Sequence, residues 1–311
     1  MSGLLTEAFI TSLMFGAITA GVPLLFAGLG EQISEKAGVL NIGIEGMMLT
    51  GAYGGFAVAY YSGSFWLGFL AGGVGGGLVA ALMALFCVRL GMNQIVIGIA
   101  LTLGAEGLTA LLHFFQFSRT YPRLGNHGEH GIPLLDSIPV IGRALFDHHP
   151  LVYLLVAFTF GLAWLFRSTF VGLNLEAAGN KPPALDAAGV SVIATRVYAV
   201  LATGFLAGIG GAYMANVGAG LFIPFMTGGA GFIAIVLAML ARGRPLWVLL
   251  GALLFGISLA LTTALQVAGL NIPTDVVQML PFAMVMLVLV IFGRHSYLPP
   301  ALGHPYVRGQ R

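Results

Sequence analysis

The chain has 311 residues, of which 58% are hydrophobic and only 8% are charged, and its mean hydropathy is +0.97. A water-soluble domain of this length does not reach that hydropathy, so the composition predicts an integral membrane protein. The formal net charge of +2 is too small to indicate a nucleic-acid partner, and the single cysteine, Cys87, excludes a disulfide within the chain.

Apolar stretches of about the length that crosses a bilayer, ~20 residues, predict one all-α domain over residues 1–311 with about nine spanning helices (8–10). The N-terminus lacks the basic region of a secretory signal, so the first stretch is expected to be a retained helix. The seventh is too short for an ordinary spanning helix. The predicted spans are residues 8–29, 39–61, 65–90, 95–117, 151–166, 197–217, 230–241, 246–268 and 276–292.

The most informative passage is residues 30–51, GEQISEKAGVLNIGIEGMMLTG, which is polar although long apolar runs flank it. It contains Glu31, Glu35, Lys36 and Glu45, and a charged group near the centre of a membrane helix costs ~2.5–3.5 kcal/mol. Such groups mark cavities, interfaces or transport pathways. Glu45 could pair with a neighbour or bond unwound backbone, or it could only fix a helix junction.

Two apolar segments, one in each half of the chain, are interrupted: residues 39–61 by glycines, and residues 218–241 by Pro224 and a pair of glycines. Discontinuous helices in corresponding positions of two halves are typical of a substrate pathway near the membrane midplane. The alternative is that the glycines only permit tight helix packing. The predicted pathway residues are Asn41, Glu45, Asn93, Gln94, Asn216, Phe222, Gly228 and Gly229.

Some of these residues have a structural alternative. The two amides that open the fourth span could cap that helix instead of facing the pathway. Asn216, Phe222 and Phe225 border the broken seventh segment, where the rings could stack on a base or a sugar or could simply face lipid. Glu106 in the fourth span is expected to make a buried structural hydrogen bond.

The orientation follows from the lysines and arginines, because cytosolic loops carry an excess of them. Ten of the 13 fall on one predicted side, which places the N-terminus and the 118–149 loop outside. The 167–196 segment and the 294–311 tail are then cytosolic. The external loop contains His127, His130, His148 and His149, which could hold a metal or form a polar docking face; no metal site is predicted from this spacing alone.

The longest polar segment on the predicted cytosolic side is residues 167–196. Lys181 is followed by two prolines, which suit the start of a helix, and Gly189 suits its end, so a short helix is expected over residues 184–188. A small helix between two membrane spans could dock a partner, or the segment could be an ordinary solvated connection.

The sequence lacks both an ATP-binding motif and a recognisable set of catalytic residues. The chain contains no G-x-x-x-x-G-K-[ST] sequence, so it cannot hydrolyse ATP by that route. No Ser-His-Asp or paired-carboxylate arrangement can be assembled either, so neither an enzyme nor a cofactor is expected. Energy for active transport would come from another subunit or from an ion gradient.

The SEKAGVLNIGIEGMM sequence closely resembles the permease subunits of bacterial ABC importers for nucleosides and simple sugars. AAGNKPPALDAAGVSV, GFLAGIGGAY and FIAIVLAMLARGRP also resemble that family, so the resemblance covers residues 20–293. It implies a bacterial inner-membrane importer of nucleosides, or of simple sugars, with a second permease subunit, a cytosolic ATPase and an external substrate-binding lipoprotein. Branched-chain amino-acid permeases share the superfamily and are an alternative. An ion-coupled secondary transporter would need several intramembrane carboxylates, and only Glu45 and Glu106 are available.

The resemblance also implies that residues 176–190 form the coupling helix that sits in a cleft of the ATPase. The family often has a basic residue where this chain has Glu176. The residues expected to couple the permease to the ATPase are Glu176, Asn180, Lys181, Ala184, Asp186, Ala187 and Gly189.

Overall fold

The structure is a computed structural model that describes residues 7–125, 141–267, 279–292 and 298–307. Parts of the predicted 118–149 loop, of the last two spans and of the 294–311 tail therefore lie outside the described residues. Within them the regular elements are helices, two of which end in a π-helical turn. They are α1 (Glu7–Lys36), α2 (Ile44–Ser62), α3 (Phe65–Met83) with η1 (Ala84–Arg89), α4 (Gln94–Phe117), α5 (Ile141–Phe146), α6 (Pro150–Ser168), α7 (Phe170–Asn180), α8 (Pro182–Ala187), α9 (Val192–Tyr213) with η2 (Met214–Ala219), α10 (Ala230–Leu240), α11 (Pro245–Val267) and α13 (Leu280–Phe292).

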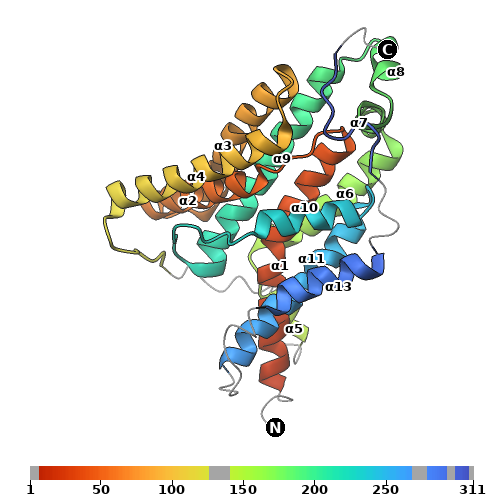
Figure 1. Ribbon diagram of the computed structural model, residues 1–311. Coiled ribbons are helices and arrows are strands. Elements are labelled where there is room, and N and C mark those ends of the chain that lie inside the picture. Colours follow the sequence, from red (N-terminus) through yellow and green to blue (C-terminus); the bar gives the residue numbers. More distant parts are fainter. Residues whose placement is uncertain (1–6, 126–140, 268–278, 293–297, 308–311) are drawn as a thin grey trace.

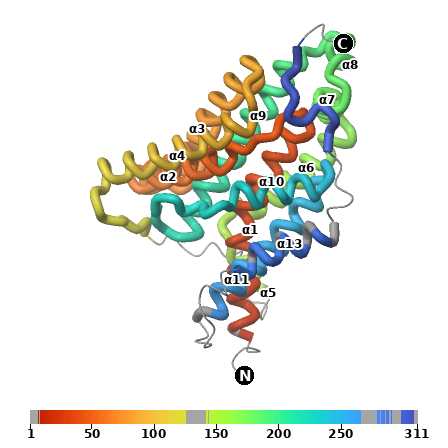
Figure 2. Tube along the Cα trace, in the orientation of Figure 1, coloured from red at the N-terminus to blue at the C-terminus, as the bar shows by residue number. Residues whose placement is uncertain are grey.

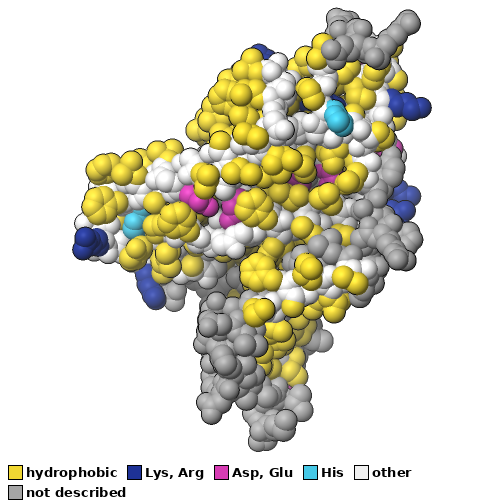
Figure 3. Space-filling model, viewed as in Figure 1, with side chains coloured by type: hydrophobic (Ala, Val, Ile, Leu, Met, Phe, Trp, Pro, Cys, Tyr) yellow, Lys and Arg dark blue, Asp and Glu magenta, His cyan; other side chains and the backbone are white. Residues whose placement is uncertain are grey.

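Six helical segments of the described chain are long and apolar enough to cross a membrane, which confirms a polytopic helical membrane protein. Figure 3 shows hydrophobic side chains over much of one face of the molecule. The other three predicted spans correspond to α2, to α10, which has 11 residues, and to α13. The predicted shortness of the seventh segment is thus confirmed. The six segments are Phe9–Lys36, Phe65–Arg89, Gln94–Phe117, Pro150–Ser168, Val192–Ala219 and Pro245–Leu265.

The second helix begins later than the sequence predicts. α1 continues to Lys36, and residues 37–43 form a non-helical turn before α2. Gly38 has a φ of +87°, and the N–H of Val39 donates to the carbonyl of Ser34 at 3.0 Å, which is the usual way to close a helix with a left-handed glycine. The glycines expected to interrupt residues 39–61 lie instead in the continuous helix Ile44–Ser62, apart from Gly43, which precedes it. That part of the prediction is wrong, because glycine in a membrane helix serves packing as readily as it serves a break.

Glycines bring the backbones of α3 and α9 into direct contact. A side-chain carbon added to Gly76 would lie 2.2 Å from the carbonyl oxygen of Gly204, and one added to Gly208 would lie 2.2 Å from that of Gly72. The pairing runs in opposite directions along the two helices, so they are antiparallel. Small residues allow this approach, which in lipid supplies the dispersion contacts that hold helices together.

The long helix α1 passes through the middle of the molecule (Figure 1). α2, α3 and α4 lie to one side of it and pack on one another, whereas α11 crosses α1 and packs against it, and α13 packs on α11. α9 packs against both α1 and α3, and α10 packs against α1 and α11. Residues 298–307 return to the end of the molecule that holds α7 and α8 (Figure 2).

Gly76 and its neighbour Gly77 provide a matched test of this packing. We expect Gly76→Ala to destabilise the protein by about 1–3 kcal/mol, because the new methyl group has no room against the α9 backbone. Gly77 has nothing within 4 Å of an added carbon, so Gly77→Ala should be neutral or slightly stabilising. Thermal unfolding in detergent measures both. Equal melting temperatures would contradict the packing described here.

Candidate functional site

The turn at residues 37–43 is held by side chains from three different helices. The N–H of Asn41 donates to Glu31 Oε1 of α1 at 3.0 Å, and the N–H of Leu40 donates to Gln94 Oε1 of α4 at 2.8 Å. Arg196 Nε of α9 donates to the carbonyl of Ala37 at 3.1 Å. The three side chains are buried. They supply the partners that the backbone of this turn cannot find within a helix.

The carboxylate of Glu45 joins the two segments that were predicted to be interrupted. Glu45 Oε1 accepts from the N–H of Gly229 at 2.9 Å, and Oε2 accepts from the N–H of Gly231 at 2.6 Å. These amides open α10, and the first N–H groups of a helix have no partner within it and carry partial positive charge. A buried carboxylate is therefore well placed to cap this short helix. A side-chain carbon on Gly231 would lie 2.7 Å from Glu45, so the contact leaves room only for glycine.

A cavity of about 1450 Å³ lies beside the loop that precedes α10. Its walls come from the first half of α1, from η2, from residues 223–228, from α10, from α11 and from α13. The walls are mainly apolar, and among them stand several hydroxyl groups. These belong to Ser12, Thr19, Thr227, Thr262 and Thr263.

The predicted pathway residues of the second half are divided between this cavity and the protein interior. Gly228 lines the cavity, and Gly229 bonds Glu45. Phe222 is fully buried and packs with a ring centroid 5.3 Å from that of Tyr53. Asn216 is also buried, and its Nδ2 donates to the carbonyl of Gly55 at 3.4 Å.

The predicted pathway residues of the first half lie at helix ends and junctions. Asn93 is exposed and caps α4, since its Oδ1 accepts from the N–H groups of Ile95 and Val96 at 2.9 and 3.2 Å. Gln94 and Asn41 meet at the 37–43 turn. None of these three side chains lines the cavity. Phe225, by contrast, lines it and is 56% exposed.

The predicted short helix in the 167–196 segment is present as α8, which begins at Pro182 and is followed by Gly189 with a φ of +84°. Leu185 is buried and anchors α8 by packing with Ala178 and Val192. The opposite side of α8 is exposed. Of the residues predicted to contact an ATPase, Lys181, Ala184, Ala187 and Gly189 are exposed, and Asp186 is half-buried.

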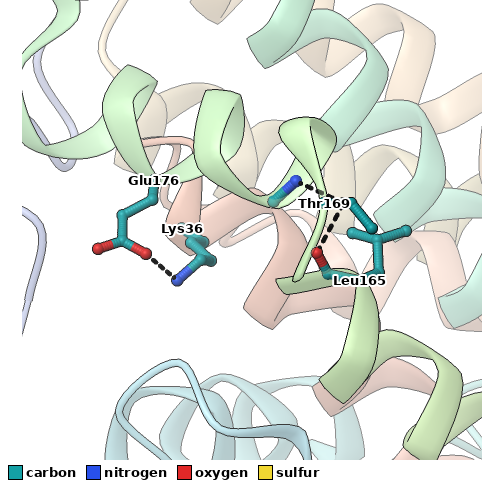
Figure 4. A network of polar contacts seen from close by, with 5 residues as sticks. Lys36, Leu165, Thr169 and Glu176 are labelled. Carbon is teal, nitrogen blue, oxygen red and sulfur yellow. Dashed lines mark hydrogen bonds and ion pairs between the residues drawn. The ribbon is translucent and has the colours of Figure 1, made fainter. Parts of the chain in front are cut away.

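Glu176 and Lys36 link the end of α1 to α7. Lys36 Nζ lies 2.8 Å from Glu176 Oε2, and the two side chains point toward one another (Figure 4). An acidic residue at this position therefore has a basic partner within the chain. Figure 4 also shows Thr169, whose hydroxyl donates to the carbonyl of Leu165 at 2.7 Å and accepts from the N–H of Gly172, so that it joins α6 to α7.

Sequence reasoning missed the role of Arg196, which it counted only as a residue that sets the orientation. Arg196 is 2% exposed, and its guanidinium donates to the carbonyls of Ala37, Ala178 and His304 at 3.1, 3.2 and 2.7 Å. The available signal was its place directly before a long apolar stretch. A buried arginine there must satisfy its N–H groups within the protein.

The described histidines of the 118–149 loop have structural partners. His148 stacks on Phe15 with ring centroids 4.5 Å apart, and its Nε2 lies 3.0 Å from the carbonyl oxygen of Ala144. Burial lowers the pKa of the His148 imidazole. His149 caps α6 through its Nδ1. His127 and His130 lie outside the described residues.

The Glu45 contact predicts faster local opening when the carboxylate is replaced. In Glu45→Gln, one amide of α10 faces an NH₂ group instead of an acceptor, which costs about 1–3 kcal/mol. We expect hydrogen exchange of the Gly229 and Gly231 amides to accelerate roughly tenfold or more. Glu106→Gln is the control, because Glu106 is half-buried on α4 and the Gly229 and Gly231 amides bond Glu45 instead. Unchanged exchange at these two amides in Glu45→Gln would contradict the capping role.

Known proteins show the family to which this architecture belongs. The family described as branched-chain amino acid transport system / permease component matches residues 13–289. A putative glucose ABC transporter permease of Haloferax volcanii is 40% identical over 80% of this chain and 76% of its own length. A nucleoside ABC transporter permease of Lactococcus lactis is 34% identical and a guanosine ABC transporter permease of Bacillus subtilis is 31% identical, each over 93% of this chain and 94% of its own length. The resemblance seen in the sequence is confirmed: the chain belongs to this permease family and is a multi-pass membrane component of an ABC transporter.

Proposed function

We propose that this protein is the permease subunit of an ATP-driven importer of nucleosides, with simple sugars as the second candidate substrate. The relatives named for nucleoside and guanosine transport match nearly the whole chain, and a relative named for glucose transport has the higher identity over a shorter part. The observation that carries the proposal is the cavity of about 1450 Å³ beside the broken segment that leads into α10.

The lining of the cavity suits a neutral, hydroxyl-bearing solute. Ligand sites typically enclose ~300–1,000 Å³, so this space is large enough for a nucleoside together with water. Serine and threonine hydroxyls can bond a ribose or a sugar, and Phe9, Phe15 and Phe225 offer rings on which a base can stack. Among the described residues the lining contains no charged side chain, which favours a neutral substrate over a zwitterionic branched-chain amino acid. It also disfavours coupling to an ion bound there.

A continuous set of contacts links α8 to this cavity. α8 packs on α7 through Leu185, α7 bonds α1 through Glu176 and Lys36, and α1 leads into the braced 37–43 turn. α2 follows the turn, and its Glu45 holds the start of α10. A displacement of α8 by an ATPase would thus be transmitted through these contacts to the loop that lines the cavity. We infer that the 167–196 segment faces this ATPase in the cytosol, and that the 118–149 loop faces a binding lipoprotein outside the cell membrane.

A cavity-filling variant tests the substrate pathway. Thr263 lines the cavity and its side chain is exposed, so Thr263→Trp should fill the space without disturbing the fold. We expect the initial rate of nucleoside uptake into vesicles that contain the assembled transporter to fall tenfold or more. Leu250→Trp is the control, since Leu250 is exposed on the same helix but does not line the cavity. Normal uptake by Thr263→Trp, or equal losses in both variants, would remove the cavity from the pathway.

Competition of labelled nucleoside uptake by unlabelled nucleoside, glucose or leucine identifies the substrate class.

The orientation is tested with single cysteines in a Cys87→Ser background. Thr120 lies in the part of the predicted external loop that the structure describes, and Ala188 follows α8; both are exposed. With the N-terminus outside, an impermeant maleimide should label Thr120→Cys in intact cells and Ala188→Cys only after lysis. Reversed labelling would overturn the proposed topology.

A further inference from the structure

The last described segment, residues 298–307, is held by backbone hydrogen bonds to the elements around α8. We call it the C-terminal strap. The N–H of Ala301 donates to the carbonyl of Gly179 in α7 at 2.9 Å, and the N–H of Gly303 donates to the carbonyl of Gly38 in the turn after α1 at 3.2 Å. The strap therefore crosses the coupling segment and the 37–43 turn together (Figure 2).

The strap also reaches the turn between η1 and α4. A side-chain carbon on Gly91 would lie 3.5 Å from Cβ of Pro305, so the two segments are in contact distance. At the other side Tyr306 packs on the small cluster that anchors α8, formed by Ala178, Leu185 and Val192. The strap thus connects α8 with the turn after η1, which lies about 90 residues earlier in the chain.

The strap, α8 and the turn between η1 and α4 each carry exposed side chains, several of them apolar. The apolar ones include Leu90 and Met92, which are 62% and 46% exposed, and Val307, which is 51% exposed. Arg89 at the end of η1 and Lys181 just before α8 are also exposed. An apolar surface of this kind on the cytosolic side favours a protein partner, and the basic residues favour acidic side chains around the partner's cleft.

We propose that the C-terminal strap is part of the surface that binds the ATPase, and that Arg196 is the positioning residue that fixes the strap to the coupling segment and to the 37–43 turn. This inference rests on the proposed function, because it adds a second contact to the one assigned to α8. The partner surface is an apolar cleft with an acidic rim that receives α8 and the strap side by side.

The guanidinium of Arg196 joins the strap to both the 37–43 turn and α7. It bonds one carbonyl from each of the three segments: Ala37 of the turn, Ala178 of α7 and His304 of the strap. A planar fork of N–H donors can hold three acceptors in fixed directions, whereas a lysine ammonium on a flexible stem cannot reproduce that arrangement. A movement of the strap would therefore move the 37–43 turn through Arg196. This linkage acts in addition to the contacts that connect α8 to the turn.

The binding test uses the full-length permease in nanodiscs and, as probe, the ATPase subunit that co-purifies with it. Pro305 and Val307 are exposed, so Pro305→Glu/Val307→Glu should fold normally; we expect ATPase binding at least tenfold weaker, because an acidic rim repels the new carboxylates. Ala187→Glu on α8 should have a similar effect, and Arg123→Glu in the predicted external loop should have none.

The outcomes separate the two hypotheses. Weaker binding in the α8 variant with normal binding in the strap variant would overturn the strap and leave the coupling segment in place. Normal binding in both would reject the coupling assignment as well. A loss in the strap variant that disappears in lipid-free detergent would assign the strap to the membrane surface and overturn its role in docking.

A second measurement tests Arg196 as a positioning residue. Arg196→Lys keeps the charge but loses the three-way hydrogen bonding. We expect the number of substrate molecules transported per ATP hydrolysed to fall at least threefold in the assembled transporter. A variant with a lower melting temperature but an unchanged transport ratio would show that Arg196 is only structural. The strap variant, whose substitutions are exposed, keeps the proposal testable if Arg196→Lys fails to assemble.

Discussion

The structure depends on one constraint: the backbone of residues 37–43 leaves the helical path while it is buried in a membrane protein. Lipid offers no hydrogen bonds, so each N–H and C=O group of such a turn needs a partner in the protein. Three long polar side chains supply partners, and they come from three separate helices: Glu31 from α1, Gln94 from α4 and Arg196 from α9. Satisfying this short turn therefore fixes how these helices are placed around it.

The same constraint explains why Glu45 and Arg196 lie inside an apolar bundle. A buried charge is tolerated where its hydrogen-bonding groups are matched. Glu45 meets this condition with two backbone amides at the start of α10, and Arg196 meets it with three carbonyls. Both residues use backbone groups that have no partner within their own helices. The charges thus join segments that are distant in sequence, and removing one would leave several polar groups unsatisfied at once.

The helices of the bundle are not packed equally closely. The α2, α3 and α9 helices meet through glycines whose backbones touch, which leaves no space for a side chain between them. A unit of this kind moves as one body, because interfaces packed to this density do not deform gradually. Around the cavity, by contrast, the broken segment before α10 makes only a few backbone hydrogen bonds, among them those of Met226 and Gly228. This non-helical segment lies beside the space proposed for the substrate.

The sequence by itself determined what depends on local pattern. Long apolar runs fixed the membrane class, Pro182 and Gly189 marked the two ends of α8, and the SEKAGVLNIGIEGMM passage identified the family. Each of these features follows from neighbouring residues, since helix ends and bilayer-length stretches are properties of short segments.

Only the tertiary structure decided which distant groups meet. Glu45 finds its partners 184 and 186 residues away, and Arg196 bonds carbonyls 159 residues before it and 108 residues after it. The tertiary structure also decided that Phe222 is enclosed in the core while Phe225 faces the cavity, although both are phenylalanines of one short loop. The physical reason is that the way the helices cross decides which hydrogen-bonding partner or which cavity a polar or aromatic side chain meets. That crossing depends on the packing of the whole bundle, which no local stretch of sequence encodes.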